Sequence, residues 1–153
     1  MAQNQPSKAI AVIPSDTINI PVPGIITSGT NTGGATTLTD AGQDFTNATT
    51  NANGYNISGG DVVISAAGVI SEIASVDSAT QLTLLTAIAA GTYDIYKGNY
   101  QILGESEGFT LFVGTGGPAT VLRIQTLTGQ DVSLLNIPDS SFIPIQVQRV
   151  WAT

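Results

Sequence analysis

The first residues of this sequence whose type and spacing suggest chemistry are two glutamates. Glu105 and Glu107 form the kind of carboxylate pair that glycosidases use as general acid and base. They lie in a short loop between Gly104 and Gly108, without the apolar surroundings that would tune the pKa of one of them. We therefore interpret the pair as part of an exposed loop.

Aspartates supply a second candidate site, because carboxylate oxygens are ligands for calcium. Asp40 with Asp44, and Asp61 with Asp77, are the pairs in question. Their spacing matches no EF-hand loop, and aspartate is also a common turn former. We predict solvated turns at these positions and no metal site.

Three further motifs have an ordinary structural explanation. Gly114-Thr115-Gly116-Gly117 has the glycine content of a phosphate-binding loop but lacks the Lys-Ser/Thr that should follow, so it predicts a hairpin turn. Asn47-Ala48-Thr49 and Asn56-Ile57-Ser58 match the glycosylation sequon. No signal peptide is visible, so we expect both matches to be fortuitous.

The chain contains no histidine and no cysteine. Ser-His-Asp and Cys-His catalysis, His/Cys zinc sites and disulfides are therefore excluded within it. We predict a protein that is not an enzyme, with no catalytic residues, no cofactor and no metal.

The net charge of the chain excludes one class of binding partner. Eleven acidic residues against four basic ones give a formal net charge of −7, which repels nucleic acid. Only 10% of the residues are charged, against about 25% in typical soluble domains. Such a surface suits a protein packed against neighbours. The apolar stretches 9–13 and 82–90 are too short or too interrupted to span a membrane.

The fold that positions these residues is predicted to be all-β. Glu, Lys and Arg are scarce, whereas Thr, Val, Ile and Gly are plentiful. Short strands are predicted at 9–13, 17–20, 35–38, 61–64, 69–76, 81–84, 92–96, 109–113, 119–126, 131–135 and 143–150. A helix over 81–90 is the alternative for one stretch.

The C-terminal stretch is typical of a half-buried strand, because apolar and polar residues alternate over 143–148. Pro144 favours an edge position. Arg149 is an even number of residues from Ile143, Ile145 and Val147, so a regular strand would place it on the same face as these apolar residues. Either a bulge reverses the facing of the strand there, or Arg149 is buried and paired with an acid of a symmetry-related chain.

A change of character along the chain predicts two domains. Residues 28–34 are polar and Gly-rich and predict a linker, while Lys97-Gly98 marks the far end of the middle block. We infer a base domain, a small β-sandwich or barrel, from residues 1–27 and 98–153. A second, barrel-like β domain is inserted at 28–97, and its two ends must lie close together.

The two ends of the chain also supply the expected contacts with other chains. The extended segment 9–20 is suited to strand donation to a neighbouring subunit, with packing inside its own domain as the alternative. Trp and Arg are enriched at interface hot spots, although core burial of Phe142 and Trp151 is the alternative there. The candidate interface comprises Ile10, Val12, Ile18, Ile20, Phe142, Arg149 and Trp151.

Residues 14–21, 111–117 and 136–153 resemble a family of small tailed-phage virion proteins that includes the head spike base protein of gene transfer agents. The resemblance covers about half of the chain. Within the middle block, residues 38–45, 60–63 and 76–84 are similar to a module inserted in various phage structural proteins. The usual base domain of the family lacks so large an insert.

The resemblance implies a non-enzymatic virion protein, either a capsid decoration (cement) protein or a head spike base. It would bind the major capsid protein as a symmetric homo-oligomer, with a fibre or spike as a further partner. Its location would be the capsid surface, after assembly in the host cytoplasm. The alternatives are a tail or baseplate component, or a glycan-binding module in the insert, where three of the four tyrosines lie within 93–100.

Overall fold

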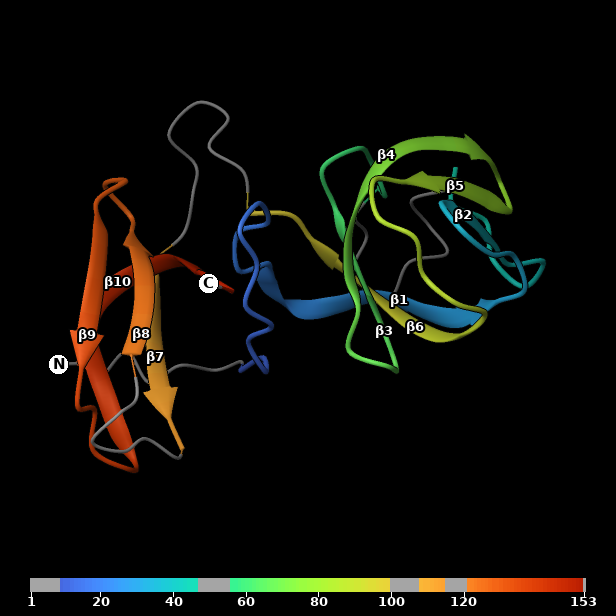
Figure 1. Ribbon diagram of the computed structural model, residues 1–153. Helices are drawn as coiled ribbons and strands as arrows, with labels where there is room; N and C mark the ends of the chain where they lie inside the picture. The colour runs from blue at the N-terminus through green and yellow to red at the C-terminus, as the bar shows by residue number, and fades with distance from the viewer. Residues whose placement is uncertain (1–8, 47–55, 100–107, 115–120, 153) are drawn as a thin grey trace, which may run out of the picture. The chain divides into compact units, whose positions relative to one another are not determined.

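The computed structural model of the chain describes residues 9–46, 56–99, 108–114 and 121–152. These ranges contain strands and no helix, which confirms the all-β class. The strands form two antiparallel sheets (Figure 1). Neither sheet closes into a barrel, so the barrel-like closure expected for the middle of the chain does not occur.

The larger sheet has the order β1-β6-β3-β4-β5-β2. Its strands are β1 (Val22–Asn31), β2 (Thr37–Thr39), β3 (Val62–Ser65), β4 (Ile70–Ser78), β5 (Gln81–Leu84) and β6 (Gly91–Lys97). The smaller sheet has the order β7-β10-β8-β9. Its strands are β7 (Phe109–Val113), β8 (Val121–Thr126), β9 (Asp131–Leu135) and β10 (Ser141–Val150).

The chain forms two compact units. The first comprises Met1–Ala11 and Pro21–Gly98, and the second comprises Val12–Ile20 and Asn99–Thr153. The middle block thus begins at Pro21 instead of residue 28. Its two ends lie side by side, because Val22 pairs with Lys97 where β1 begins and β6 ends.

The expected linker at 28–34 is wrong over its first half, because β1 continues to Asn31 and pairs with β6 as far as Gly91. A Cβ atom on Gly29 would collide with the Asp40 carboxylate and the Tyr93 hydroxyl. The glycine therefore allows close packing rather than flexibility. Pro23 is tolerated because β1 lies at the end of the sheet and is interrupted by bulges near its start.

The first unit has a continuous hydrophobic core between the strands of the larger sheet and its connections. Its fully buried members include Ile26, Leu38, Phe45, Val63, Ile73, Leu82 and Ile95. Leu82 and Leu84 are buried, whereas Gln81 and Thr83 between them are partly exposed. This period of two confirms a strand at 81–84 and excludes the alternative helix.

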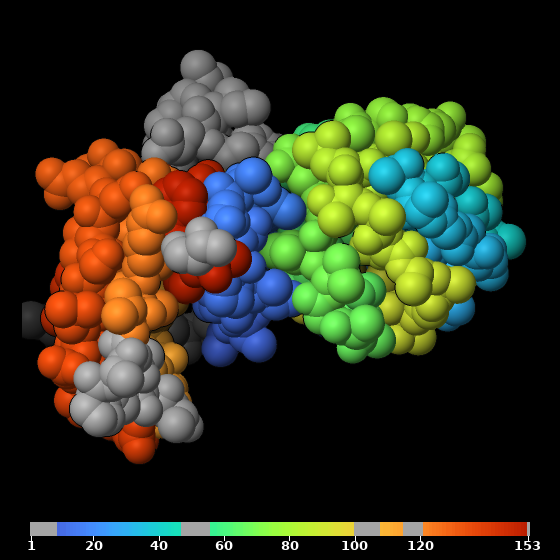
Figure 2. Space-filling model, in the orientation of Figure 1, coloured from blue at the N-terminus to red at the C-terminus, as the bar shows by residue number. Residues whose placement is uncertain are grey.

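The strands expected at 9–13 and 17–20 are absent. Instead, the amides of Ser15 and Ile20 donate to the carbonyls of Val150 and Gln148 in β10. The Ser15 hydroxyl accepts a bond from the Ile18 amide, which turns the chain between these two contacts. Figure 2 shows this N-terminal segment, in blue, against the end of β10, in red.

Candidate interaction surface

The register of the smaller sheet determines which side chains share a face. Phe142 lies opposite Phe112, Arg149 opposite Gln125, and Val121 opposite Leu135. Side chains directly opposite each other project from the same face, and alternate residues of a strand project from opposite faces. We call the face that carries these pairs the outward face. The other face carries Leu111, Ile124, Ile143, Val147 and Val150, all of them buried.

The outward face exposes two pairs of large apolar side chains. Phe112 and Phe142 are 56% and 67% exposed, and their ring centroids lie 5.0 Å apart at an interplanar angle of 55°. Val121 and Leu135 are 61% and 65% exposed. Four such residues on one sheet face make it the candidate interaction surface, because soluble proteins rarely leave large apolar patches in water.

A bulge near the end of β10 brings Arg149 to the outward face. Val147 lies opposite Thr126 and Arg149 opposite Gln125, so two steps along β10 match one step along β8. The bulge interpretation of Arg149 is therefore confirmed. Its Nε donates to Asn19 Oδ1 at 2.9 Å and its Nη1 to the Asp16 carbonyl at 3.2 Å.

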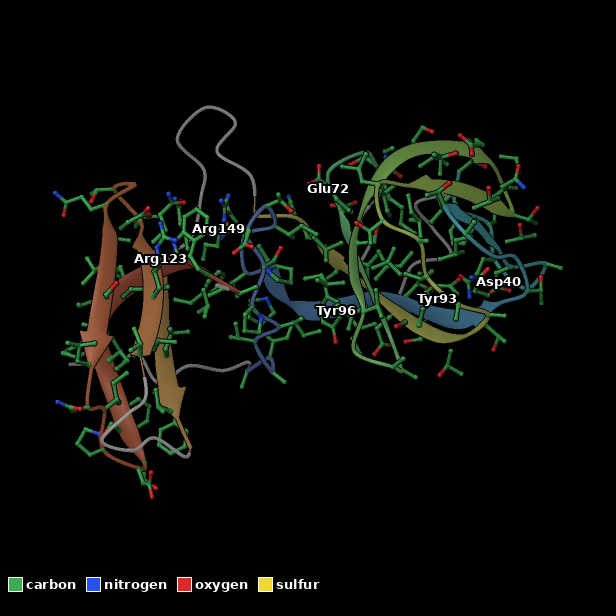
Figure 3. All side chains as sticks on the ribbon, viewed as in Figure 1. Asp40, Glu72, Tyr93, Tyr96, Arg123 and Arg149 are labelled. Atoms are coloured by element: carbon green, nitrogen blue, oxygen red, sulfur yellow. The ribbon has the colours of Figure 1, made fainter. Side chains whose placement is uncertain are left out.

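Two of the four basic residues of the chain meet at Trp151 on the same face. The guanidinium carbons of Arg123 and Arg149 lie 4.6 and 5.2 Å from the indole centroid, and the two arginines are labelled beside each other in Figure 3. Each cation–π contact contributes about 0.5–1 kcal/mol at an exposed site. Arg123 also forms an ion pair with Asp131 at 3.2 Å. This cluster holds the end of β10 to β8 and to the segment 12–20.

The seven expected interface residues differ in their accessibility. Ile10, Val12, Ile18, Arg149 and Trp151 are partly buried, and Ile20 is buried. Only Phe142 is exposed among the seven. The backbone of residues 15–20 forms hydrogen bonds with β10 of the same unit. This segment therefore packs within its own unit and is not donated as a strand to a neighbouring subunit.

Sequence reasoning missed Phe112, Val121 and Leu135. The alternation in 109–113 signals that Phe112 faces away from Leu111, but it does not say which of the two faces is covered. That choice depends on which partner strand and which register β7 adopts, and neither is visible from local sequence.

Asp40 and Asp61 are buried, so the prediction of solvated turns is wrong for these two. Asp40 Oδ2 accepts from the Thr30 amide at 2.7 Å and from the Tyr93 hydroxyl at 2.9 Å (Figure 3). Asp61 accepts from the amides of Ser58 and Gly98, both at 3.0 Å. Burial raises the pKa of Asp61, and these hydrogen bonds oppose the rise. Both carboxylates therefore hold in place the backbone segments whose amide groups they bind.

The other two aspartates that were considered as calcium ligands, Asp44 and Asp77, bind neighbouring hydroxyl and amide groups. Asp77 is exposed and accepts bonds from the Ser75 and Thr83 hydroxyls, which lower its pKa. Asp44 accepts from the amide and hydroxyl of Thr46. The residues that the structure describes contain no group of three acidic side chains able to hold a metal ion.

The alternative of a glycan-binding module relied on Tyr93, Tyr96 and Tyr100, of which the structure describes the first two. Tyr93 is 2% exposed, and burial, together with the hydrogen bond to Asp40, raises its pKa. Tyr96 is partly buried, and desolvation and the charge of Asp94 raise its pKa. Tyr100 lies outside the described residues. Tyr93 is therefore not accessible for stacking.

A shallow depression of about 350 Å³ lies over β1, β3 and β6 in the first unit. Ser28, Thr30, Thr92 and Asp94 contribute hydroxyls and a carboxylate to its lining. Ser28 Oγ donates to Asp94 Oδ1 at 2.6 Å. These groups form hydrogen bonds with polar, uncharged ligands, but no cation is present in the lining to hold an anion.

The remaining motifs carry no site in the described residues. Asn56 and Ser58 are exposed. Gly114 accepts a bond from the Ser140 amide, which continues the pairing of β7 with β10. The hairpin expected at Gly114 is wrong, because β10 lies between β7 and β8 in the sheet. Glu105, Glu107, Gly116, Gly117 and the sequon at 47–49 lie outside the described residues.

Comparison of the chain with protein-family models, curated proteins and solved structures finds no match. Over the described ranges, no helix is long and apolar enough to cross a membrane.

Proposed function

We propose that this chain is a non-enzymatic structural protein of a bacteriophage virion, a capsid decoration or head spike base protein. It binds the major capsid protein as a symmetric homo-oligomer and acts by repeated burial of surface. The resemblance of the two outer segments to small virion proteins supports the assignment to a virion. The architecture of the second unit supports the assignment to an assembly.

The observation that carries the proposal is the exposed apolar face of the smaller sheet in the second unit. A sheet is stable when each apolar face packs against another layer. One face of the smaller sheet carries buried side chains, whereas the outward face carries large apolar side chains that are exposed. Phe112, Phe142, Val121 and Leu135 face solvent, and Leu122, Val132 and Leu134 on the opposite face are only partly buried. A partner surface supplies the missing layer.

Among the described residues that suggested chemistry, Asp40 and Asp61 act structurally and so agree with this role. Asp40 and Asp61 anchor backbone amides, and Arg149 ties the segment 12–20 to β10. A rigid unit with an exposed apolar face is suited to docking, because little conformational entropy is lost on binding.

Mass spectrometry of purified particles tests the virion assignment. The expected result is a chain present in a copy number that is a multiple of the capsid symmetry. Particles that lack the protein should bind purified wild-type protein and bind Phe112→Ser/Phe142→Ser at least tenfold more weakly. Leu85→Ser is the matched control, because Leu85 is 64% exposed and lies in the first unit. Absence of the chain from particles would overturn the proposal.

A tail or baseplate position remains within the same proposal of a structural protein. The measurement that separates the two positions is a particle reconstruction with the chain labelled. Label on the capsid shell supports decoration, and label on the tail supports the baseplate role.

A second candidate function is glycan binding by the first unit. The depression lined by Ser28, Thr30, Thr92 and Asp94 favours it, because hydroxyls and carboxylates recognise sugar hydroxyl groups. A glycan array probed with the full chain tests this function, with Asp94→Asn as the variant that should lose signal. An array without any signal removes the candidate and leaves the structural role unaffected.

A further inference from the structure

Strand β9 forms one edge of the smaller sheet, and its outer side has no partner strand among the described residues (Figure 1). Where β8 and β9 are joined, the amide of Thr126 donates to the carbonyl of Gln130. Hydrogen-bonded pairs alternate with non-hydrogen-bonded pairs along an antiparallel ladder. In the register of β8 with β9, the backbone groups of Asp131, Ser133 and Leu135 therefore point away from β8.

The two edges of the larger sheet are protected against further pairing. β1 contains Pro23 and is interrupted by bulges. β2 has three residues, and the amide of its Thr39 donates to Asn31 Oδ1 while the carbonyl accepts from the Thr32 amide. β9 has no such protection, because it contains no proline or lysine and pairs with β8 without a bulge. An unprotected edge is a template for a further strand.

We propose that β9 pairs with β9 of a second copy of the chain, in an antiparallel two-fold arrangement centred on Ser133. In this register Ser133 lies opposite Ser133 of the other copy, and Asp131 lies opposite Leu135. All three residues with outward backbone groups then find a partner, which gives about six backbone hydrogen bonds between the copies. A two-fold contact uses the same strand twice and closes the assembly at two chains.

The side chains of β9 are complementary to themselves in this register. Val132 of each copy lies opposite Leu134 of the other, and both side chains are only partly buried in a single chain. Pairing therefore covers apolar surface with apolar surface, and no two like charges lie opposite each other. A register centred on Asp131 would place two carboxylates opposite each other and leave Leu135 without a partner in β9. This self-complementarity identifies a second copy as the partner strand.

This inference deepens the proposed function and rests on it for the role of the contact. Side chains directly opposite each other project from the same face of a sheet, so pairing puts the outward faces of both copies on one side of a continuous sheet. The exposed pairs Phe112–Phe142 and Val121–Leu135 of both copies then line one surface that can dock on the capsid. The strand contact is smaller than a standard interface of about 800 Å² per partner, so we expect a dissociation constant on the order of 0.1 mM in solution.

Disulfide formation tests the register, because the chain has no native cysteine. The Cα atoms of a hydrogen-bonded pair lie about 5.5 Å apart, which suits a disulfide. With oxidised glutathione as the oxidant, purified Ser133→Cys should therefore form a covalent dimer. Leu135→Cys is the matched control, because Leu135 is also exposed but lies about 14 Å from Leu135 of the other copy. We expect Ser133→Cys to react about tenfold faster, and equal rates would overturn the register.

Sedimentation of the purified chain gives a second, independent readout, at about 1 mM protein and about 0.15 M salt to screen the repulsion between acidic chains. We expect dimers in the wild type and in Ser133→Ala, and monomers in Ser133→Pro. Proline removes an amide hydrogen from the outer side of the edge and leaves the bonds to β8 in place, so circular dichroism should show a retained fold.

Three outcomes of these measurements would overturn the pairing. They are a monomeric wild type, a folded Ser133→Pro that dimerises as well as the wild type, and oligomers larger than a dimer, which would indicate pairing of β9 with β7 of the next copy. A chain absent from particles would overturn the virion role and leave the pairing intact. A chain present in particles that fails both tests would overturn only the pairing.

Discussion

The hydroxyl of Tyr93 donates a 2.9 Å hydrogen bond to Oδ2 of Asp40 in the interior of the first unit. The same oxygen accepts from the Thr30 amide, and Oδ1 accepts from the Gly42 amide. One carboxylate thus joins β6, β1 and the turn after β2. Because a buried carboxylate is costly unless it is hydrogen-bonded, these donors determine how the three segments meet.

Removal of the Tyr93 hydroxyl should weaken the first unit. We expect Tyr93→Phe to lower the free energy of unfolding by about 1–3 kcal/mol, since it leaves a buried carboxylate with one donor fewer. Urea unfolding followed by circular dichroism measures the change. Tyr96→Phe is the control, because it removes a hydroxyl from the same strand without a hydrogen bond to Asp40. Equal effects of the two substitutions would contradict the role of Tyr93.

Gly29 should tolerate no side chain. An added methyl group would collide with the Asp40 carboxylate and the Tyr93 ring, so we expect Gly29→Ala to destabilise by about 1–3 kcal/mol. Gly34→Ala should be nearly neutral, because nothing lies within 4 Å of a Cβ atom there. Thermal unfolding of both variants checks the difference. A neutral Gly29→Ala would show that β1 and β6 are less closely packed than described.

Asp61 should make stability fall as the pH rises. Burial raises its pKa in the folded state above 3.8, so the folded chain holds this proton more tightly than the unfolded chain does. Its contribution is most favourable below 3.8 and is lost as the pH rises through the folded-state pKa. Asp61→Asn should remove this dependence.

Asp77 serves as a control, because its contribution to stability should change with pH in the direction opposite to that of Asp61. Hydrogen bonds lower its pKa, so its contribution is present above 3.8 and is lost as the pH falls through the folded-state pKa. Urea unfolding at a series of pH values, for the wild type, Asp61→Asn and Asp77→Asn, measures both slopes. Identical slopes in the wild type and Asp61→Asn would refute the prediction for Asp61.

Trp151 is the only tryptophan of the chain, so its fluorescence reports on the second unit alone. Arg149→Lys should lower the stability seen by this probe by about 1–2 kcal/mol, because lysine cannot bond Asn19 and Asp16 with the same planar group. Arg123→Lys should cost less, since its ion pair with Asp131 is exposed. A larger loss of stability in Arg123→Lys than in Arg149→Lys would contradict the conclusion that Arg149 contributes more to the stability of this unit.

The local sequence pattern was sufficient to predict several strands of the smaller sheet. The strands at 109–113 and 131–135 have the predicted bounds. The parity of Arg149 predicted either a bulge or a buried ion pair, and the register of β10 with β8 shows that the bulge is correct. The local pattern was insufficient at Pro144 and at Gly29. Pro144 favoured an edge position, whereas β10 lies between β7 and β8. Composition alone made 28–34 look like a linker, whereas Gly29 is present because Tyr93 and Asp40 lie against it.

The sequence by itself determined that the protein is all-β, acidic and free of histidine and cysteine chemistry, because propensity and residue type are local properties. Only the tertiary structure decided that Phe112 lies opposite Phe142, that Val121 lies opposite Leu135, and that both pairs face solvent. Those facts depend on strand order and register, which arise from contacts between residues far apart in the chain. The surface proposed for assembly is therefore a property of the fold and not of any single segment.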